Sequence, residues 1–235
     1  MMNVVPAVDL LLFLVLPYAA VVLLVVATAE RYRKHAYSCS SHSTQFLENR
    51  QHFWGIVPFH YGLIAVLVGH LLIFALPGQV LAWNAQPLRL YLLEIAGLVF
   101  GLLAVIGLLL VVARRVTHPK LRAVTGRLDW VVYAVLGIQL ITGVQIAIVH
   151  AWGSGWFAAA AAPYLWSLVL LRPDLTFVAT LPLAIKIHIA GAFVLIAILP
   201  FSRLVHVLDV PNAYLWRRPQ VVRWHRVRPL SGERS

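Results

Sequence analysis

The sequence predicts an all-α integral membrane bundle of five transmembrane helices, with the N-terminus outside and the C-terminus in the cytoplasm. Its composition suits lipid: 61% of the residues are hydrophobic, 11% are charged and the mean hydropathy is +0.85. A soluble domain is about half apolar and about one quarter charged. Five apolar runs reach or exceed the ~20 residues that a helix needs to cross a bilayer; they cover 5–27, 54–76, 88–112, 128–150 and 180–207.

The first run, 5–27, is expected to be a retained helix. Ala27-Thr28-Ala29 resembles the small-residue site at which a signal peptide is cleaved. A signal peptide also needs a basic segment ahead of its apolar core, and no Lys or Arg precedes this run. We therefore count it as the first span.

The distribution of Lys and Arg between the loops predicts the orientation. Basic residues concentrate in 28–53, in 113–127 and in the tail after the fifth run, whereas 77–87 has none and 151–179 has only Arg172. The positive-inside rule places the basic segments in the cytoplasm. Five spans then put the N-terminus outside.

The formal net charge of +11 thus belongs to one face of the protein. We divide the chain into a membrane domain, 1–210, and a basic cytoplasmic tail, 211–235. The basic face would meet anionic lipid headgroups or an acidic cytoplasmic partner, and it does not indicate nucleic acid. The single cysteine, Cys39, excludes a disulfide and a cysteine-ligated iron–sulfur centre, so any cofactor needs other ligands.

Four of the ten histidines lie inside apolar runs: His60 and His70 in the second run, and His188 and His206 in the fifth. An ionisable side chain at membrane depth is costly, so it usually has a partner inside the bundle. A single histidine would more often hydrogen-bond a neighbouring helix than bind a metal. Two on each of two helices favour metal ligation.

Depth in the membrane predicts which histidines pair. The second and fifth helices run antiparallel, so His60 should face His206 near the cytoplasm, and His70 should face His188 near the outer surface. His60 and His70 are separated by ~15 Å of helix, and His188 and His206 by ~27 Å. Either the coordination axes slant or a helix bends, and Pro200 is the expected bend.

Paired imidazoles in a helix bundle are typical of a b-type haem with two axial histidines, whose iron has no position left for O₂ or substrate. Two such haems would carry electrons across the membrane. Gly62, Gly69 and the small residues at 190–192 would leave room for the flat macrocycles. Alternatively, these residues let the helices approach closely.

Several segments resemble the gamma subunit of respiratory nitrate reductase, a membrane cytochrome b. They are FHYGLIAVLVGH at 59–70, His188, LPFSRLVH at 199–206 and VPNAYLWRRPQVVR at 210–223. The resemblance covers nearly the whole chain. It implies two b-type haems, with His60 and His206 as ligands of the haem nearer the cytoplasm, and His70 and His188 as ligands of the outer haem.

The resemblance also implies a substrate and partners. Quinol would be oxidised beside the outer haem, in the cytoplasmic (inner) membrane of a prokaryote. Electrons would pass inward to an iron–sulfur beta subunit and then to a molybdenum-containing alpha subunit, where nitrate is reduced.

Charged residues in or beside the spans have more than one interpretation. Arg203, three residues before His206, would hold a haem propionate or extend to the inner headgroups. Arg89 lies where the family carries a basic residue close to its quinol site, or it anchors a helix at the interface. Glu94 would accept a quinol proton, neutralise Arg89 or bond a hydroxyl. Lys186 is expected to extend to the outer surface.

The cytoplasmic partner is predicted to dock on basic residues. The predicted docking surface combines the loop residues Arg114, Arg115 and Arg122 with the tail from Arg217 to Arg228. The alternative is that these residues only anchor the protein to lipid.

Two other functions remain open. One is a dihaem quinol-oxidising subunit that serves a different terminal reductase. The other is a membrane ion transporter that uses the histidines as a relay or as metal ligands. A transporter would predict more intramembrane carboxylates than Glu94 alone, and a broken helix or an inverted repeat.

Overall fold

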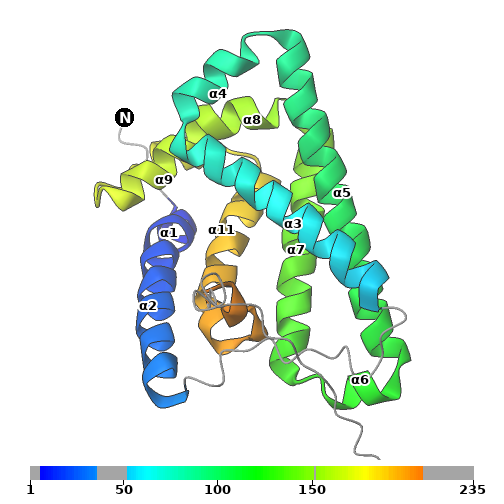
Figure 1. Cartoon of the computed structure of the whole chain (residues 1–235). Coiled ribbons are helices and arrows are strands. Elements are labelled where there is room, and N and C mark those ends of the chain that lie inside the picture. The colour runs from blue at the N-terminus through cyan, green and yellow to red at the C-terminus, as the bar shows by residue number, and fades with distance from the viewer. Residues whose placement is uncertain (1–5, 36–51, 151, 209–235) are drawn as a thin grey trace, which may run out of the picture.

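The computed structural model describes residues 6–35, 52–150 and 152–208, and in these ranges the chain is helical and contains no β-strand (Figure 1). Five helices are long and apolar enough to span a membrane, which confirms the predicted fold class; they are Ala7–Lys34, Phe53–Ala75, Pro87–Thr117, Arg127–Val149 and Leu183–Phe201. The sides on which the termini lie stay a prediction. The predicted tail, 211–235, lies outside the described residues.

The spans are built from eight segments: α1 (Ala7–Leu10), the π-helical η1 (Leu11–Val15), α2 (Leu16–His35), α3 (His52–Ala75), α5 (Pro87–Thr117), α7 (Arg127–Val149), α11 (Leu183–Ile198) and the 3₁₀ turn η4 (Leu199–Phe201). Shorter helices connect them: α4 (Pro77–Asn84), α6 (Pro119–Ala123), α8 (Gly153–Trp156), the π-helical η3 (Phe157–Ala161), α9 (Ala162–Val169) and α10 (Thr176–Ala179). The alanine run at 158–162 lies in η3 and at the first residue of α9, between the fourth and fifth spans.

Proline and glycine mark the helix starts. Pro77, Pro87 and Pro119 lie at the beginnings of α4, α5 and α6, where the missing N–H removes no intrahelical hydrogen bond. At the start of α7, the N–H of Gly126 donates to Asp129 Oδ2 at 2.9 Å. These residues let the chain turn sharply between spans.

The five spans pack as a chain of neighbours. α3 packs on α5, α5 on α7, α7 on α11, and α11 on α2 (Figure 1). α4, α8 and α9 lie at one end of the bundle, which we call the α8 end, and α6 lies at the other, the α6 end. The α6 end carries the basic loop predicted to be cytoplasmic.

Glycine allows α3 and α5 to touch along their backbones. A Cβ atom on Gly62 of α3 would lie 2.5 Å from the backbone nitrogen of Ala104, and one on Gly107 of α5 would lie 2.3 Å from that of Phe59. Close helix approach, the alternative that the sequence left open, thus accounts for Gly62. By contrast, a Cβ on Gly69 would meet no atom within 4 Å.

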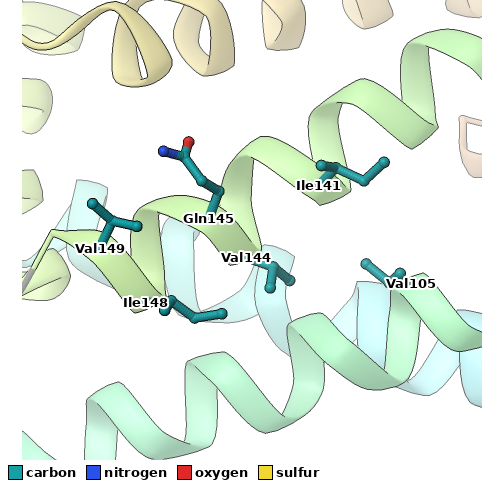
Figure 2. Close-up of a pocket in the computed structure, with 6 residues that line it drawn as sticks. All are labelled: Val105, Ile141, Val144, Gln145, Ile148 and Val149. Carbon is teal, nitrogen blue, oxygen red and sulfur yellow. The ribbon is translucent and has the colours of Figure 1, made fainter.

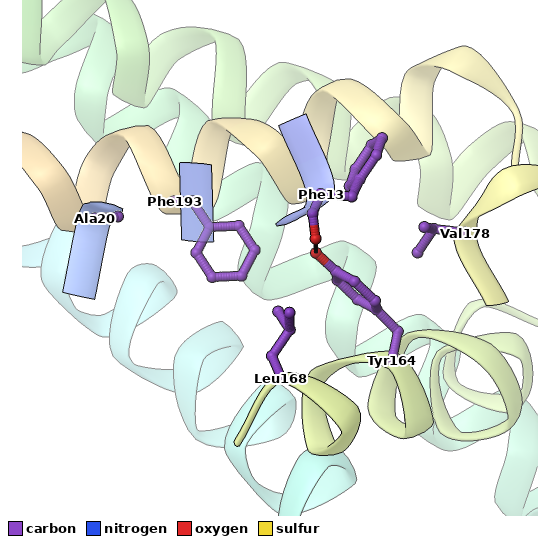
Figure 3. Packing of buried hydrophobic residues seen from close by; sticks show 6 residues of the cluster. All are labelled: Phe13, Ala20, Tyr164, Leu168, Val178 and Phe193. Atoms are coloured by element: carbon purple, nitrogen blue, oxygen red, sulfur yellow. Dashed lines mark hydrogen bonds between the residues drawn. The ribbon is translucent and has the colours of Figure 1, made fainter. Parts of the chain in front are cut away.

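A buried apolar core fixes the first span to the α8 end. It contains Phe13, Ala20, Tyr164, Leu168, Val178 and Phe193 (Figure 3). The Tyr164 hydroxyl donates to the carbonyl of Phe13 at 2.8 Å, and burial raises the pKa of this phenol far above its ordinary value, which keeps the donor protonated. The π-helical turn around Phe13 is thereby held against α9.

Lys186 pairs inside the bundle, so the prediction that it extends to the outer surface is wrong. Its Nζ lies 2.8 Å from Asp9 Oδ2, and the two side chains are only 18% and 12% exposed. The ammonium also lies 5.9 Å from the ring centroid of Phe13. Asp9 offers a desolvated counter-charge, and pairing with it replaces contact with headgroups.

We expect this ion pair to stabilise the contact between the first span and α11. Asp9→Asn would leave the ammonium of Lys186 with little solvation and lower the unfolding free energy by up to about 3 kcal/mol. Lys186→Met would lower it similarly by stranding the carboxylate. Thermal denaturation of the detergent-solubilised protein measures both losses.

The double variant Asp9→Leu/Lys186→Met is the matched control. It removes both charges, so its melting temperature should lie above that of either single variant. Strictly additive losses would show that the two side chains do not stabilise each other.

Candidate functional site

The four intramembrane histidines form two pairs between α3 and the fifth span. His60 and His206 have ring centroids 6.5 Å apart, with 51° between the ring planes. The rings of His70 and His188 are 6.2 Å apart and inclined by 39°. These are the pairs that the depth argument predicts. In the described chain the backbones of α3 and α11 hardly touch, so the imidazoles meet between two helices that do not pack together.

The ring separations fit one metal ion between each pair. A metal–imidazole bond is about 2 Å long and the bonding nitrogen lies about 1 Å from the ring centre, so a shared ion places the centres about 6 Å apart. Within the described residues, no group of three or more His, Cys, Asp or Glu side chains lies close enough to hold an ion. A bare zinc ion usually takes three or four protein ligands. Two imidazoles suit a metal whose other ligands belong to its own cofactor, as the porphyrin ligands of haem iron do.

Three of the histidines are oriented by backbone carbonyls. The Nδ1 atom of His60 lies 2.9 Å from the oxygen of Ile56, that of His70 lies 2.8 Å from the oxygen of Val66, and that of His206 lies 2.7 Å from the oxygen of Arg203. A carbonyl only accepts, so each Nδ1 carries the proton. Each Nε2 is therefore left with the lone pair that a metal needs.

His188 is oriented by a different helix. Its Nδ1 lies 3.1 Å from Thr142 Oγ1 and its Nε2 lies 3.3 Å from the amide nitrogen of Gln139, both on α7. Neither residue was predicted from the sequence. Their spacing of three on an apolar helix is a weak signal, because polar residues in spans often bond only to neighbouring helices.

The helix that carries His188 breaks before His206, as the position of Pro200 predicts. α11 ends at Ile198 and is followed by two 3₁₀ turns, η4 (Leu199–Phe201) and η5 (Arg203–Val207), on either side of the extended residue Ser202. Proline lacks the N–H that would continue the helix. His188 and His206 are separated by more residues than His60 and His70, and the break explains how both pairs can nevertheless face each other.

Arg31 stabilises the broken segment from the first span. Its Nη1 donates to the carbonyl of Pro200 at 2.6 Å and to that of Ser202 at 3.2 Å. Ser202 Oγ accepts the N–H of Leu204 at 3.1 Å, which caps η5. Backbone groups freed at membrane depth need such partners, and these bonds hold the turn from which His206 extends.

Two arginines, Arg203 and Arg115, are held by polar contacts at the α6 end, the end of the His60–His206 pair. Arg203 Nε lies 3.1 Å from Asp129 Oδ1, and its Nη2 donates to the carbonyl of Val124 at 2.8 Å. Arg115 donates to Thr125 Oγ1 at 2.9 Å and lies over the Tyr133 ring at 5.6 Å. The Nε of Arg115 is buried and has no hydrogen-bond partner among the described residues, so an added carboxylate would satisfy it.

Two arginines of the predicted docking surface are buried. Arg114 and Arg115 are only 4% and 8% exposed, so the prediction that they form part of an exposed surface is wrong. α5 continues to Thr117 and carries both residues on its packed face. Arg122 is exposed, as are Lys120 and Arg127. The tail from Arg217 to Arg228 lies outside the described residues.

A polar cluster occupies the α8 end. Glu94 Oε1 accepts from the N–H of Ser154 at 2.8 Å and from its hydroxyl at 2.6 Å, and Asn84 Nδ2 donates to the same hydroxyl at 2.9 Å. Glu94 thus bonds a hydroxyl, one of the roles considered for it. Arg89 lies 4.9 Å over the ring of Trp83, where Arg89 can anchor the start of α5.

Aromatic rings connect this cluster to His70. The ring of Phe157 lies 5.3 Å from His70 and 6.3 Å from Trp156. The indole N–H of Trp156 is buried and makes no hydrogen bond to any described residue. A Cβ on Gly153 would lie 3.2 Å from Glu94 Oε2 and 3.8 Å from that nitrogen. An acceptor and an unused donor therefore lie close together near one histidine pair.

An apolar groove of about 290 Å³ runs between α5 and α7 (Figure 2). It is lined by Val105, Ile141, Val144, Gln145, Ile148 and Val149. None of the four paired histidines lines it, and Gln145 is its single polar residue. The groove matches a lipid-facing surface and is separate from the histidine pairs.

Comparison with known proteins gives one family. Residues 9–225 match the family model described as nitrate reductase gamma subunit. The nitrate reductase gamma chain of Bacillus subtilis is 28% identical over 89% of this chain and 95% of its own length. The respiratory nitrate reductase 1 gamma chain of Escherichia coli is 26% identical over 92% and 97%. The nitrate reductase-like protein NarX of Mycobacterium tuberculosis is 28% identical over 88% of this chain and 32% of its own length. With five spans and a family model that matches most of its length, this chain belongs to the nitrate reductase gamma subunit family and is a membrane subunit of a nitrate reductase.

Proposed function

We propose that the chain is the dihaem cytochrome b subunit that oxidises quinol and delivers electrons to the nitrate-reducing subunits. The observation that carries the proposal is the pair of facing imidazoles repeated twice, at ring separations of 6.5 and 6.2 Å. His60 and His206 would hold one haem iron, and His70 and His188 the other. Each haem, when bound, supplies a one-electron carrier.

The α6 end offers groups for the haem propionates. The Nε of Arg115 is unpartnered among the described residues, and Arg203 lies three residues before His206. A carboxylate would form charge-assisted hydrogen bonds with them. Arg203 would then share its charge between Asp129 and a propionate.

The α8 end offers groups for quinol. Oxidation of a quinol to a quinone releases two electrons and two protons. Glu94 Oε2 would accept one hydroxyl proton, the other proton would pass to water at this end of the bundle, and the indole N–H of Trp156 would bond a ring oxygen. Arg89 would steady the head group from the start of α5. Because this end is the predicted outer side, protons would leave outside while electrons pass to the His60–His206 pair.

The α6 end is the predicted cytoplasmic side of a prokaryotic inner membrane. There the electrons would leave for an iron–sulfur beta subunit and then a molybdenum-containing alpha subunit. The exposed cations Lys120, Arg122 and Arg127 form a basic surface that an acidic partner would complement. Anionic lipid would meet the same charges where the partner leaves them uncovered.

The observations do not favour an ion transporter. Three carboxylates lie inside the described spans near other helices, and each has a partner: Asp9 has Lys186, Glu94 has Ser154 and Asp129 has Arg203. A relay needs groups that can exchange protons or ions in sequence. The break in the fifth span is shared with transporters, but here Arg31 satisfies the freed carbonyls.

An absorption spectrum of the purified full chain tests the proposal. We expect Soret and α bands of b-type haem that respond to dithionite, with two haems per chain by extraction, and partial reduction by an added quinol. A preparation that binds a metal ion without haem would favour the transporter. Reducible haem with no nitrate-reducing partner on copurification would favour a different terminal reductase.

A further inference from the structure

The four histidines differ in how their Nδ1 atoms are held. Those of His60, His70 and His206 face carbonyl groups of their own helical segments. That of His188 faces the hydroxyl of Thr142, 3.1 Å away on α7. The hydrogen bond at Nδ1 of His188 therefore depends on a side chain that a single substitution removes, whereas those of the other three histidines depend on the backbone.

The hydroxyl of Thr142 has a defined direction. Its oxygen lies 2.8 Å from the carbonyl of Ile138 and 3.1 Å from that of Gln139, and it donates to these groups. A hydroxyl has one proton, so toward His188 the oxygen must accept. Nδ1 of His188 then carries a proton. Nε2, which lies 3.3 Å from the amide nitrogen of Gln139, carries the lone pair, and iron would take that lone pair in place of the amide.

One face of α7 encloses the His188 ring. Gln139, Thr142 and Gly143 follow the spacing of three and four that places residues on one side of a helix. A Cβ on Gly143 would lie 3.0 Å from His188 Cε1, so the ring is in close contact with the α7 backbone. On the other side, Gly191 of α11 leaves space for Gln139, whose Oε1 would lie 2.5 Å from a Cβ there.

We propose that Thr142 is a positioning residue for the haem held by His70 and His188, and that it sets the reduction potential of that haem alone. The inference rests on the proposed function. A hydrogen bond accepted from the far N–H of a ligating imidazole fixes the ring and makes the ligand more basic. A more basic ligand favours the oxidised iron, so Thr142 lowers the potential of this haem.

The test uses Thr142→Val in the full chain, assembled with its partner subunits in membranes. Valine keeps the branched shape and removes the acceptor. In a redox titration followed at the α band, the potential of one haem should rise enough to change its oxidised-to-reduced ratio about tenfold, which is about 59 mV for a one-electron couple. The affected haem should be the one that is missing from His70→Ala. Thr142→Ser keeps the acceptor and should restore the original potential.

Thr117→Val is the matched control. Thr117 Oγ1 donates to the carbonyl of Ala113 at 2.9 Å and lies 3.1 Å from Nδ1 of His118, which repeats the local arrangement at a histidine outside the two pairs. This variant should leave both potentials unchanged.

Three results would overturn the proposal: unchanged potentials in Thr142→Val, equal shifts of both haems, or a Thr142→Ser variant that behaves like Thr142→Val. If Thr142→Val fails to assemble, Thr142→Cys decides the question, because a thiol is a weak acceptor and should produce a smaller rise in the same haem. Absence of haem from the unmodified protein would instead refute the proposed function, and the two failures are thus distinguishable.

Discussion

Replacing either His70 or His188 by alanine should remove one haem, and the same haem in both variants. The two rings face each other at 6.2 Å from different helices, so they are expected to ligate opposite sides of one iron. α3 and α11 hardly touch elsewhere, and one remaining imidazole would hold the group weakly. Haem extraction should show half the original content, and reduced-minus-oxidised spectra should lack the same α-band component in both variants.

His150→Ala is the control for these variants. His150 lies just after α7 at the same end of the bundle and belongs to neither pair, so both haems should remain. The pairing would be refuted if the two alanine variants lost different spectral components. It would also be refuted if His60→Ala removed the component that His188→Ala removes.

The spans and the histidine pairs were predictable because they depend on short-range rules. Apolar length sets the number of spans, and two antiparallel helices leave one consistent pairing by depth. The break at Pro200 follows from a missing N–H. The structure adds that His206 lies opposite His60 after the break, so spacings of ten and eighteen residues give two similar ring separations.

The partners of charged side chains were not predictable, because they join residues far apart in the sequence. Lys186 was expected at the surface, yet Asp9 pairs with it from 177 positions away. A carboxylate inside the first apolar run was the available signal. The basic loop predicts an exposed Arg115, because the sequence does not show which face of α5 packs against α7. Long-range pairing of this kind follows from tertiary packing alone.

The glycines illustrate the same limit on sequence reasoning. Gly62 lies two residues after His60, and Gly69 lies one residue before His70 on the same helix. Only the structure separates them: Gly62 lies against the backbone of α5, and Gly69 faces open space. A small residue in a span therefore predicts that something can approach the helix closely at that position. Whether a neighbouring helix lies there depends on the tertiary packing.

His206→Ala should separate quinol oxidation from delivery of electrons to the partner. His206 extends from η5 and faces His60 at the α6 end, whereas the polar cluster of Glu94 lies at the other end, connected to His70 through Phe157. With the inner haem absent, an added quinol should still reduce the haem of His70 and His188. Quinol-driven nitrate reduction by the assembled complex should fall to the level measured without quinol, while nitrate reduction with a soluble dye that feeds the partner subunits directly should continue.

The direction of electron flow is tested by comparing this variant with two others. His60→Ala should behave in the same way, because it removes the facing ligand of the same iron. His118→Ala should leave the complex active, since His118 bonds the carbonyl of Arg114 at 3.1 Å at the same end of the bundle but belongs to neither pair. If His206→Ala kept quinol-driven nitrate reduction, the inner haem would not be an obligatory carrier. If quinol failed to reduce the remaining haem, quinol would have to react at the α6 end, and electrons would then flow by a different route from the one proposed.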